Sequence, residues 1–162
     1  MSGTLLKPGD TIDVRPSAEP FVVQDHFVLN IESRDKILIS LIAGDFLKWF
    51  QQKREIPAGP ATLRCYELQD NAGDASIVAE LGGEARVETT LAQVFWLLER
   101  QKRGERGALA NNGWGNIFYI RDVSGTLRSV YVHWCDEAWN VEAVRIGRAA
   151  EWPIRDRAFA PA

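Results

Sequence analysis

Four side chains in this 162-residue sequence could support nucleophilic chemistry: two cysteines and two histidines. They are Cys65, Cys135, His26 and His133. A cysteine nucleophile needs an imidazole within hydrogen-bonding reach to hold it as a thiolate. On one β-strand, His133 and Cys135 would point to the same side about 6.7 Å apart, which is too far for a hydrogen bond, so His26 would have to be the partner. The alternative, which we favour, is two buried free thiols in a reducing compartment.

The same four side chains supply the number of ligands that a zinc site needs, but they lack a close pair such as C-x-x-C. Aspartates are scattered in turns, at Asp10, Asp25, Asp70 and Asp74, without the alternating spacing of a calcium loop. We therefore predict neither a metal site nor a cofactor.

A loop rich in glycine and asparagine, Gly104–Gly115, is the stretch most suited to binding a ligand or partner. Long loops without apolar periodicity are uncommon in compact domains and often carry function. Its glycines could expose Trp114 as a stacking platform for a sugar or a protein, with Asn111 and Asn112 beside it. The alternative is that the Trp114 ring plugs the edge of the sheet.

Three arginines, Arg121, Arg128 and Arg145, form a candidate site for an anion or a carboxylate, because guanidinium groups pair bidentately with both. Arg121 shares a face with the other two only if Ser124-Gly125 is a two-residue turn. If the turn is type I with Gly125 in a bulge, Arg121 points away. The arginines could also pair with nearby acids or face solvent.

The segment 116–146 predicts a three-stranded antiparallel meander, because short turns separate runs 116–123, 127–135 and 139–146. A four-residue connection places Trp134 opposite Trp139 on the core face, and Arg128 opposite Arg145 at the far end of that face.

Elsewhere the pattern predicts shorter elements and a tail. We expect strands at 11–15 and 36–43, and at 21–30 either one long strand or two with a kink at Gln24-Asp25. We also expect a hairpin of 61–68 with 76–81, a short helix at 46–53 begun by Asp45, and a long helix at 90–103 with a Thr90/Gln93 capping box. An irregular tail at 147–162 should be anchored by Trp152 and Phe159. The predicted fold class is α+β: a curved, mainly antiparallel sheet, open or partly closed, with one long helix packed on it and a second short helix.

Composition places the chain among ordinary soluble domains. Apolar residues make up 46% and charged residues 25%, and the net charge of −3 argues against a module with a wholly basic, nucleic-acid-binding surface. The sequence has neither a signal peptide nor an apolar run near the ~20 residues that span a bilayer. We therefore expect a single globular domain over 1–162 in the cytoplasm, with no membrane or nucleic-acid partner.

The last third of the chain carries a recognisable pattern. It runs Asn116-Ile117-Phe118-Tyr119-Ile120-Arg121-Asp122, Gly125, Leu127-Arg128, Val130-Tyr131, Trp134, Trp139-x-Val141-x-Ala143, and then Trp152, Arg157 and Phe159. This pattern is similar to that of a group of small uncharacterised bacterial proteins that share a C-terminal domain, although Arg145 and the turn Cys135-Asp136-Glu137 depart from it. The resemblance implies a soluble domain of bacterial type and assigns no functional residue.

The function expected from these features is non-catalytic binding or assembly, with another protein or a second copy as the partner. Tryptophan and arginine, which are enriched at interaction hot spots, support this expectation. A carbohydrate- or small-ligand-binding module that uses exposed aromatic rings is the alternative, and a cysteine-dependent enzyme is a third hypothesis.

Overall fold

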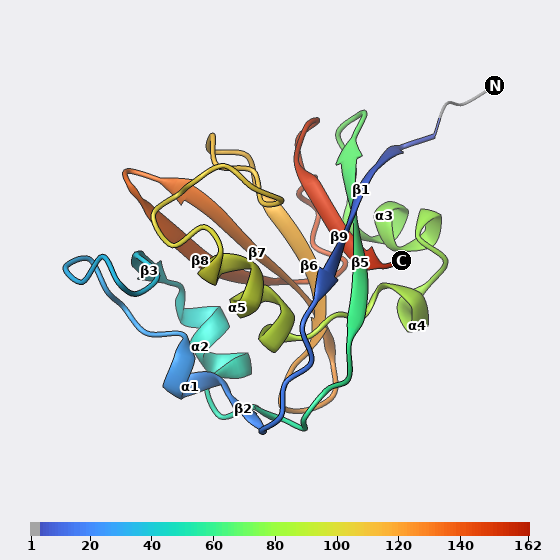
Figure 1. Cartoon of the computed structure of the whole chain (residues 1–162). Helices are drawn as coiled ribbons and strands as arrows, with labels where there is room; N and C mark the ends of the chain where they lie inside the picture. Colours follow the sequence, from blue (N-terminus) through green and yellow to red (C-terminus); the bar gives the residue numbers. More distant parts are fainter. Residues whose placement is uncertain (1–3) are drawn as a thin grey trace.

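The computed structural model describes residues 4–162 and organises them around one curved, seven-stranded sheet (Figure 1). The strand order is β1-β5-β9-β6-β7-β8-β3, and β2 pairs separately with β4. The elements are β1 (Leu6–Val14), β2 (Phe21–Val22), α1 (Val23–His26), β3 (Ile39–Ile42), α2 (Gly44–Phe50), β4 (Arg54–Glu55), β5 (Ala61–Leu68), α3 (Asp74–Glu80), α4 (Glu84–Val87), α5 (Leu91–Glu99), β6 (Asn116–Arg121), β7 (Leu127–Cys135), β8 (Ala138–Arg145) and β9 (Arg157–Pro161).

The C-terminal meander of β6, β7 and β8 is confirmed, together with its register. Trp134 lies opposite Trp139, and Arg128 lies opposite Arg145. The two indole rings meet edge to face, with centroids 5.4 Å apart. Trp139 is fully buried, and its indole N–H donates to the Gln101 carbonyl at 2.7 Å. The second hairpin is therefore fixed from the core side.

The turn between β6 and β7 determines the face of the sheet on which Arg121 lies. The amide of Gly125 donates to the Asp122 carbonyl at 3.0 Å, and Gly125 has a φ of 84°. This is the type I turn followed by a left-handed glycine. Arg121 lies opposite Leu127 in the register, so it projects from the other face of the sheet than Arg128.

The expected irregular tail is wrong, because its last part forms a central strand. β9 lies between β5, to which it is antiparallel, and β6, to which it is parallel. The predicted anchors Trp152 and Phe159 are both buried. Five residues that include Pro161 give a weak strand signal by themselves, and their pairing partners lie far away in the sequence.

The predicted hairpin of 61–68 with 76–81 is also wrong. β5 pairs with β1 and β9 instead, so both of its edges are occupied. The second half of the expected hairpin lies in helix α3, whose Ile77 and Val78 are buried. Likewise, the expected strand 21–30 is a strand only at β2, and its next residues turn into α1. Short apolar runs do not distinguish a strand from a buried helical turn.

Helix α5 begins as predicted but is not long. Thr90 and Gln93 form the capping box, with mutual hydrogen bonds of 3.0 and 3.2 Å. The helix ends at Glu99, and the Gln101 side chain just beyond it donates to the Leu109 carbonyl in the following loop. α2 starts at Gly44, and its cap position is Ala43 rather than Asp45, so the predicted cap is wrong.

Helices cover both faces of the sheet. α1, α2 and α5 lie on one side, which we call the α5 face, and α3 and α4 lie on the other, the α3 face (Figure 1). Alternate residues of β6 show the division, since Phe118 joins the α5-face core and Tyr119 joins the α3-face core. The class is therefore mixed α and β with a mainly antiparallel sheet, as predicted. The sheet is open, with β1 and β3 at its edges, and two of its six strand pairings are parallel. None of the described helices is long and apolar enough to cross a membrane.

Candidate functional site

The long loop between α5 and β6 is held by two buried side-chain amides. The Gln101 side chain donates to the carbonyls of Glu105 and Leu109 and accepts from the Leu109 amide at 2.9 Å. The Asn116 side chain exchanges hydrogen bonds with Ala110, at 2.8 and 3.1 Å. These bonds satisfy backbone groups that a helix or strand would otherwise pair, so the loop has a defined shape.

The predicted loop residues have different roles. Asn111 donates to the Gly104 carbonyl at 2.9 Å, which makes it part of the loop's internal bonding. Asn112 is exposed, and Trp114 is half-buried. Neither core cluster of the described residues includes Trp114. The Trp114 ring is therefore partly exposed and remains a candidate contact.

The three arginines do not share one site. Arg121 pairs with Glu88 at 3.1 Å and with Glu84 at 3.7 Å. Arg128 lies on the opposite face, donates to Asp122 at 2.8 Å and stacks 3.9 Å above the Trp49 ring. The exposed Arg145 lies beside Arg128 in the register.

The Asp122 carboxylate neutralises the positive charge of Arg128. Burial opposes its ionisation, but hydrogen bonds from Ser124 and Arg128 outweigh burial and lower the pKa of Asp122 to about 2. Arg128 is therefore already neutralised by its own chain, so an external anion would gain little from this side chain.

The cysteines and histidines lie apart. Burial raises the pKa of the Cys65 thiol to about 11. His133 pairs with Glu142 at 2.9 Å, and the Nδ1 of His26 donates to the Val22 carbonyl at 2.8 Å. Among residues 4–162, neither cysteine has a hydrogen bond to a histidine, and no group of three or more His, Cys, Asp or Glu side chains is arranged to hold a metal ion.

The most prominent exposed apolar surface was not predicted, and it lies around β3. Five of the eight large hydrophobic side chains that the described surface exposes belong to this region. They are Val28, Leu29, Ile31, Leu41 and Leu47, and we call them the β3 patch. The expected elements hid most of them: Val28 and Leu29 fell in the expected strand 21–30, Leu41 in the expected strand 36–43, and Leu47 in the expected helix 46–53. Apolar side chains in such elements are normally assigned to the core.

The β3 patch combines protrusions with a recess. Leu29 and Ile31 are 65% and 72% exposed. Beside them is a hollow of about 270 Å³ between α1 and α2, lined by apolar side chains that include Phe27, Phe46 and Leu47. Leu29 lines this hollow and also a second one that continues to Ser40 of β3.

The two edges of the sheet differ in how they are protected. β1 carries Lys7, Pro8 and Asp10 beside a register shift, and such charges, prolines and bulges discourage strand addition. β3 carries Ser40 and Leu41, and among residues 4–162 the pairing on its outer side is a single backbone bridge between Ile39 and Asn30. The apolar surface therefore lies at the less protected edge.

Comparison of the chain with protein-family models, curated proteins and solved structures finds no match. The similarity of the C-terminal pattern to bacterial proteins therefore remains a prediction.

Proposed function

We propose that this protein is a non-catalytic assembly domain that associates with a second copy of itself through the β3 patch. The observation that carries the proposal is the combination of projecting apolar side chains and an apolar hollow within one patch. Monomeric proteins seldom leave a contiguous apolar area of this kind without use.

A second copy is the occupant that the shape favours. In a two-fold symmetric interface the same patch serves both subunits, so it must contain both a protrusion and the recess that receives it. Leu29 and Ile31 supply the protrusion, and the hollow beside Phe46 supplies the recess. Rotation about a two-fold axis would place Leu29 of each copy against the hollow of the other.

The non-catalytic part of the proposal is supported by the state of the thiol groups. Cys65 is protonated at neutral pH, because burial raises its pKa to about 11, and thiolates are the reactive form. The nearby Asp136 carboxylate also raises the pKa of Cys135. A carbohydrate site at Trp114 is the weaker alternative, since none of the aromatic pairs among residues 4–162 includes Trp114.

Sedimentation velocity tests the assembly over concentrations from ~1 µM to ~1 mM. We expect the parent to show a concentration-dependent dimer and Leu29→Asp to weaken it by ~30-fold or more, the effect of a central hot-spot residue. Ile56→Asp is the matched control, because Ile56 is 84% exposed and lines neither hollow of the patch.

Both substitutions place a carboxylate at an exposed position, so both variants should keep the parent's circular dichroism and melting temperature. A parent that stays monomeric throughout would refute self-assembly. A dimer that Leu29→Asp and Ile56→Asp weaken equally would remove the β3 patch as its interface.

A further inference from the structure

A groove follows the outer side of α5 and reaches Val28 of the β3 patch at one end. The buried side of the helix carries Leu91, Val94, Leu97 and Leu98. Its outer stripe carries Ala92, Phe95, Trp96 and Glu99, which fall three and four residues apart and therefore line one side. The amphipathic pattern of the helix thus leaves two aromatic rings and a carboxylate facing the groove.

The groove consists of two neighbouring hollows. One, of about 180 Å³, extends between α5 and the chain around Pro16 and Ala58. The other, of about 400 Å³, extends toward Lys36 and Lys102. Three residues line both hollows and form the junction: His26, Phe95 and Glu99.

The imidazole of His26 is held in one orientation at this junction. Its ring stacks on Phe21 with centroids 4.2 Å apart and meets the edge of Phe95 at 4.9 Å. Because the Val22 carbonyl can only accept, the Nδ1 of His26 must carry the hydrogen of their 2.8 Å bond. In the neutral ring, Nε2 is then an acceptor, and it has no hydrogen-bond partner among residues 4–162.

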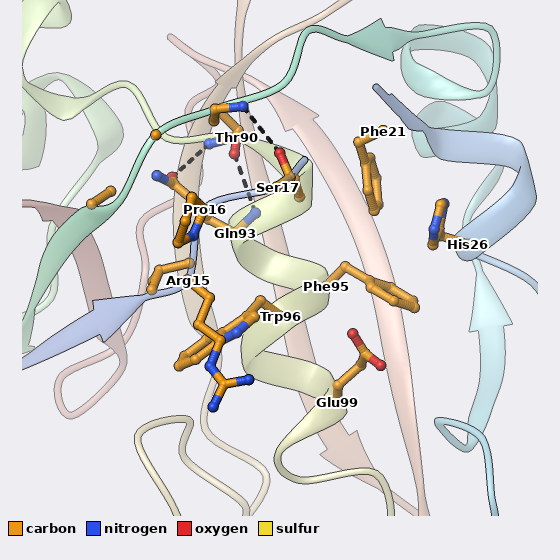
Figure 2. Close-up of a pocket in the computed structure, with 15 residues that line it drawn as sticks. Arg15, Pro16, Ser17, Phe21, His26, Thr90, Gln93, Phe95, Trp96 and Glu99 are labelled. Carbon is orange, nitrogen blue, oxygen red and sulfur yellow. Dashed lines mark hydrogen bonds between the residues drawn. The ribbon is translucent and has the colours of Figure 1, made fainter. Parts of the chain in front are cut away.

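The groups at the junction suit a planar cation. Figure 2 shows His26 and Glu99 on either side of the Phe95 ring, with Phe21 next to His26. His26 and Glu99 both offer acceptors, and the aromatic rings offer faces that attract positive charge. The same helix already shows this attraction, because the Arg100 guanidinium lies 3.8 Å above the Trp96 ring.

The surrounding charges are mixed and define how far the site extends. Asp25 and Asp35 line the second hollow opposite Lys36 and Lys102, and Arg15 lines the first. The Lys102 ammonium donates to the Asp35 carbonyl at 2.9 Å, which occupies one of its hydrogens. At the junction, His26 and Glu99 present acceptors beside the Phe95 ring, and the basic side chains Arg15, Lys36 and Lys102 line the hollows on its two sides.

The geometry points to a binding site for a small planar organic cation of the amidinium or guanidinium class at the junction of His26, Phe95 and Glu99. Such a group carries N–H donors on one flat frame, so it can donate to the Glu99 carboxylate or to Nε2 of His26. The aromatic body attached to it would lie on Phe95.

Benzamidine is the probe, and benzoate is its anionic counterpart of the same shape. We expect benzamidine at about pH 8 to shift the NMR signals of His26 and Phe95 with a dissociation constant of ~1 mM, typical of so small a ligand. Benzoate should bind at least ~10-fold more weakly, because it would face the Glu99 carboxylate.

Glu99→Gln removes the charge from an exposed side chain and should weaken benzamidine at least ~10-fold. Glu151→Gln is the control, since Glu151 is an exposed acid near the tail residue Trp152, which packs on the α3 face. His26→Phe keeps an aromatic ring at the junction but removes Nε2, so it should also weaken binding. Equal affinity for benzoate, or benzamidine binding that Glu99→Gln leaves unchanged, would refute the site.

Discussion

The two faces of the sheet are stabilised by different means. On the α5 face, aromatic rings fill the core: Phe118 and Phe159 stack at 4.8 Å, and Phe46 packs against Phe50 at 5.2 Å. On the α3 face, a buried carboxylate lies within the core. The Oδ1 atom of Asp74 accepts from the Tyr119 hydroxyl at 2.9 Å and from the Trp152 indole at 2.7 Å.

This difference explains how the tail enters the sheet. Trp152 precedes β9, and its hydrogen bond to Asp74 and its backbone pair with Ala72 hold the tail against α3. The tail then passes through Asp156 and enters the sheet as β9. Both faces therefore have an apolar core, and on the α3 face hydrogen bonds to a buried carboxylate also hold the tail.

The largest expected effect is a truncation on the α5 face. Trp139→Ala should lower the free energy of unfolding by ~3–5 kcal/mol, because it leaves a cavity where a fully buried ring lay. Chemical denaturation measures the loss. Trp134→Ala should cost less, since Trp134 is half-buried at the rim. A loss below ~1 kcal/mol for Trp139→Ala would contradict the importance of apolar packing on this face.

The sequence predicted the parts of this contrast that depend on near neighbours. The meander was correct because turns of a few residues dictate its pairing, and the capping box was correct because Thr90 and Gln93 are three residues apart. Pairing between distant segments was not visible. β9 is central because Phe159 meets Cys65 on one side and Phe118 on the other, and no local pattern records either contact.

The candidate sites show the same limit. Arg128 was recognised as a chemical group, but its partner Asp122 and the Trp49 ring beneath it set its role. The β3 patch was hidden because Leu29 and Ile31 look like core residues in sequence. Exposure is a property of the folded chain, so apolar residues that serve a surface cannot be separated from core residues by their type.

A smaller effect, on the order of 3 kcal/mol, is expected from pH on the α3 face. Asp156 is 2% exposed, and burial raises its pKa from 3.8 to about 6, against the opposing hydrogen bond from the Gly115 amide. The folded state therefore holds this proton more tightly than the unfolded state. The contribution of Asp156 to the free energy of unfolding should therefore be complete below about pH 4 and be lost as the pH rises through about 6.

Asp156→Asn tests this dependence, because an amide keeps the acceptor for Gly115 but does not ionise. The unfolding free energy of the parent should decrease between about pH 4 and pH 7, and that of the variant should not. At neutral pH the variant should therefore be more stable than the parent. Asp122, with its pKa lowered to about 2, acts in the opposite direction and only at more acidic pH. A variant with the parent's slope in urea titrations would show that Asp156 does not carry the effect.

The smallest effect should come from Trp114, which belongs to neither core. Because Trp114 is half-buried in a loop that Gln101 and Asn116 hold by hydrogen bonds to other residues, Trp114→Ala should lower the melting temperature by less than ~4 °C. Trp152→Ala is the matched comparison, since it removes the same side chain from the α3 face and leaves Asp74 without one of its donors. That variant should melt ~6–20 °C earlier, as expected for a large aromatic truncation in a core of this size.

Calorimetry on both variants separates the two interpretations of Trp114. If Trp114→Ala melts as early as Trp152→Ala, the ring caps the core and is not available to a partner. If it melts with the parent, the ring is a surface group, and the loop stays a candidate contact beside the β3 patch.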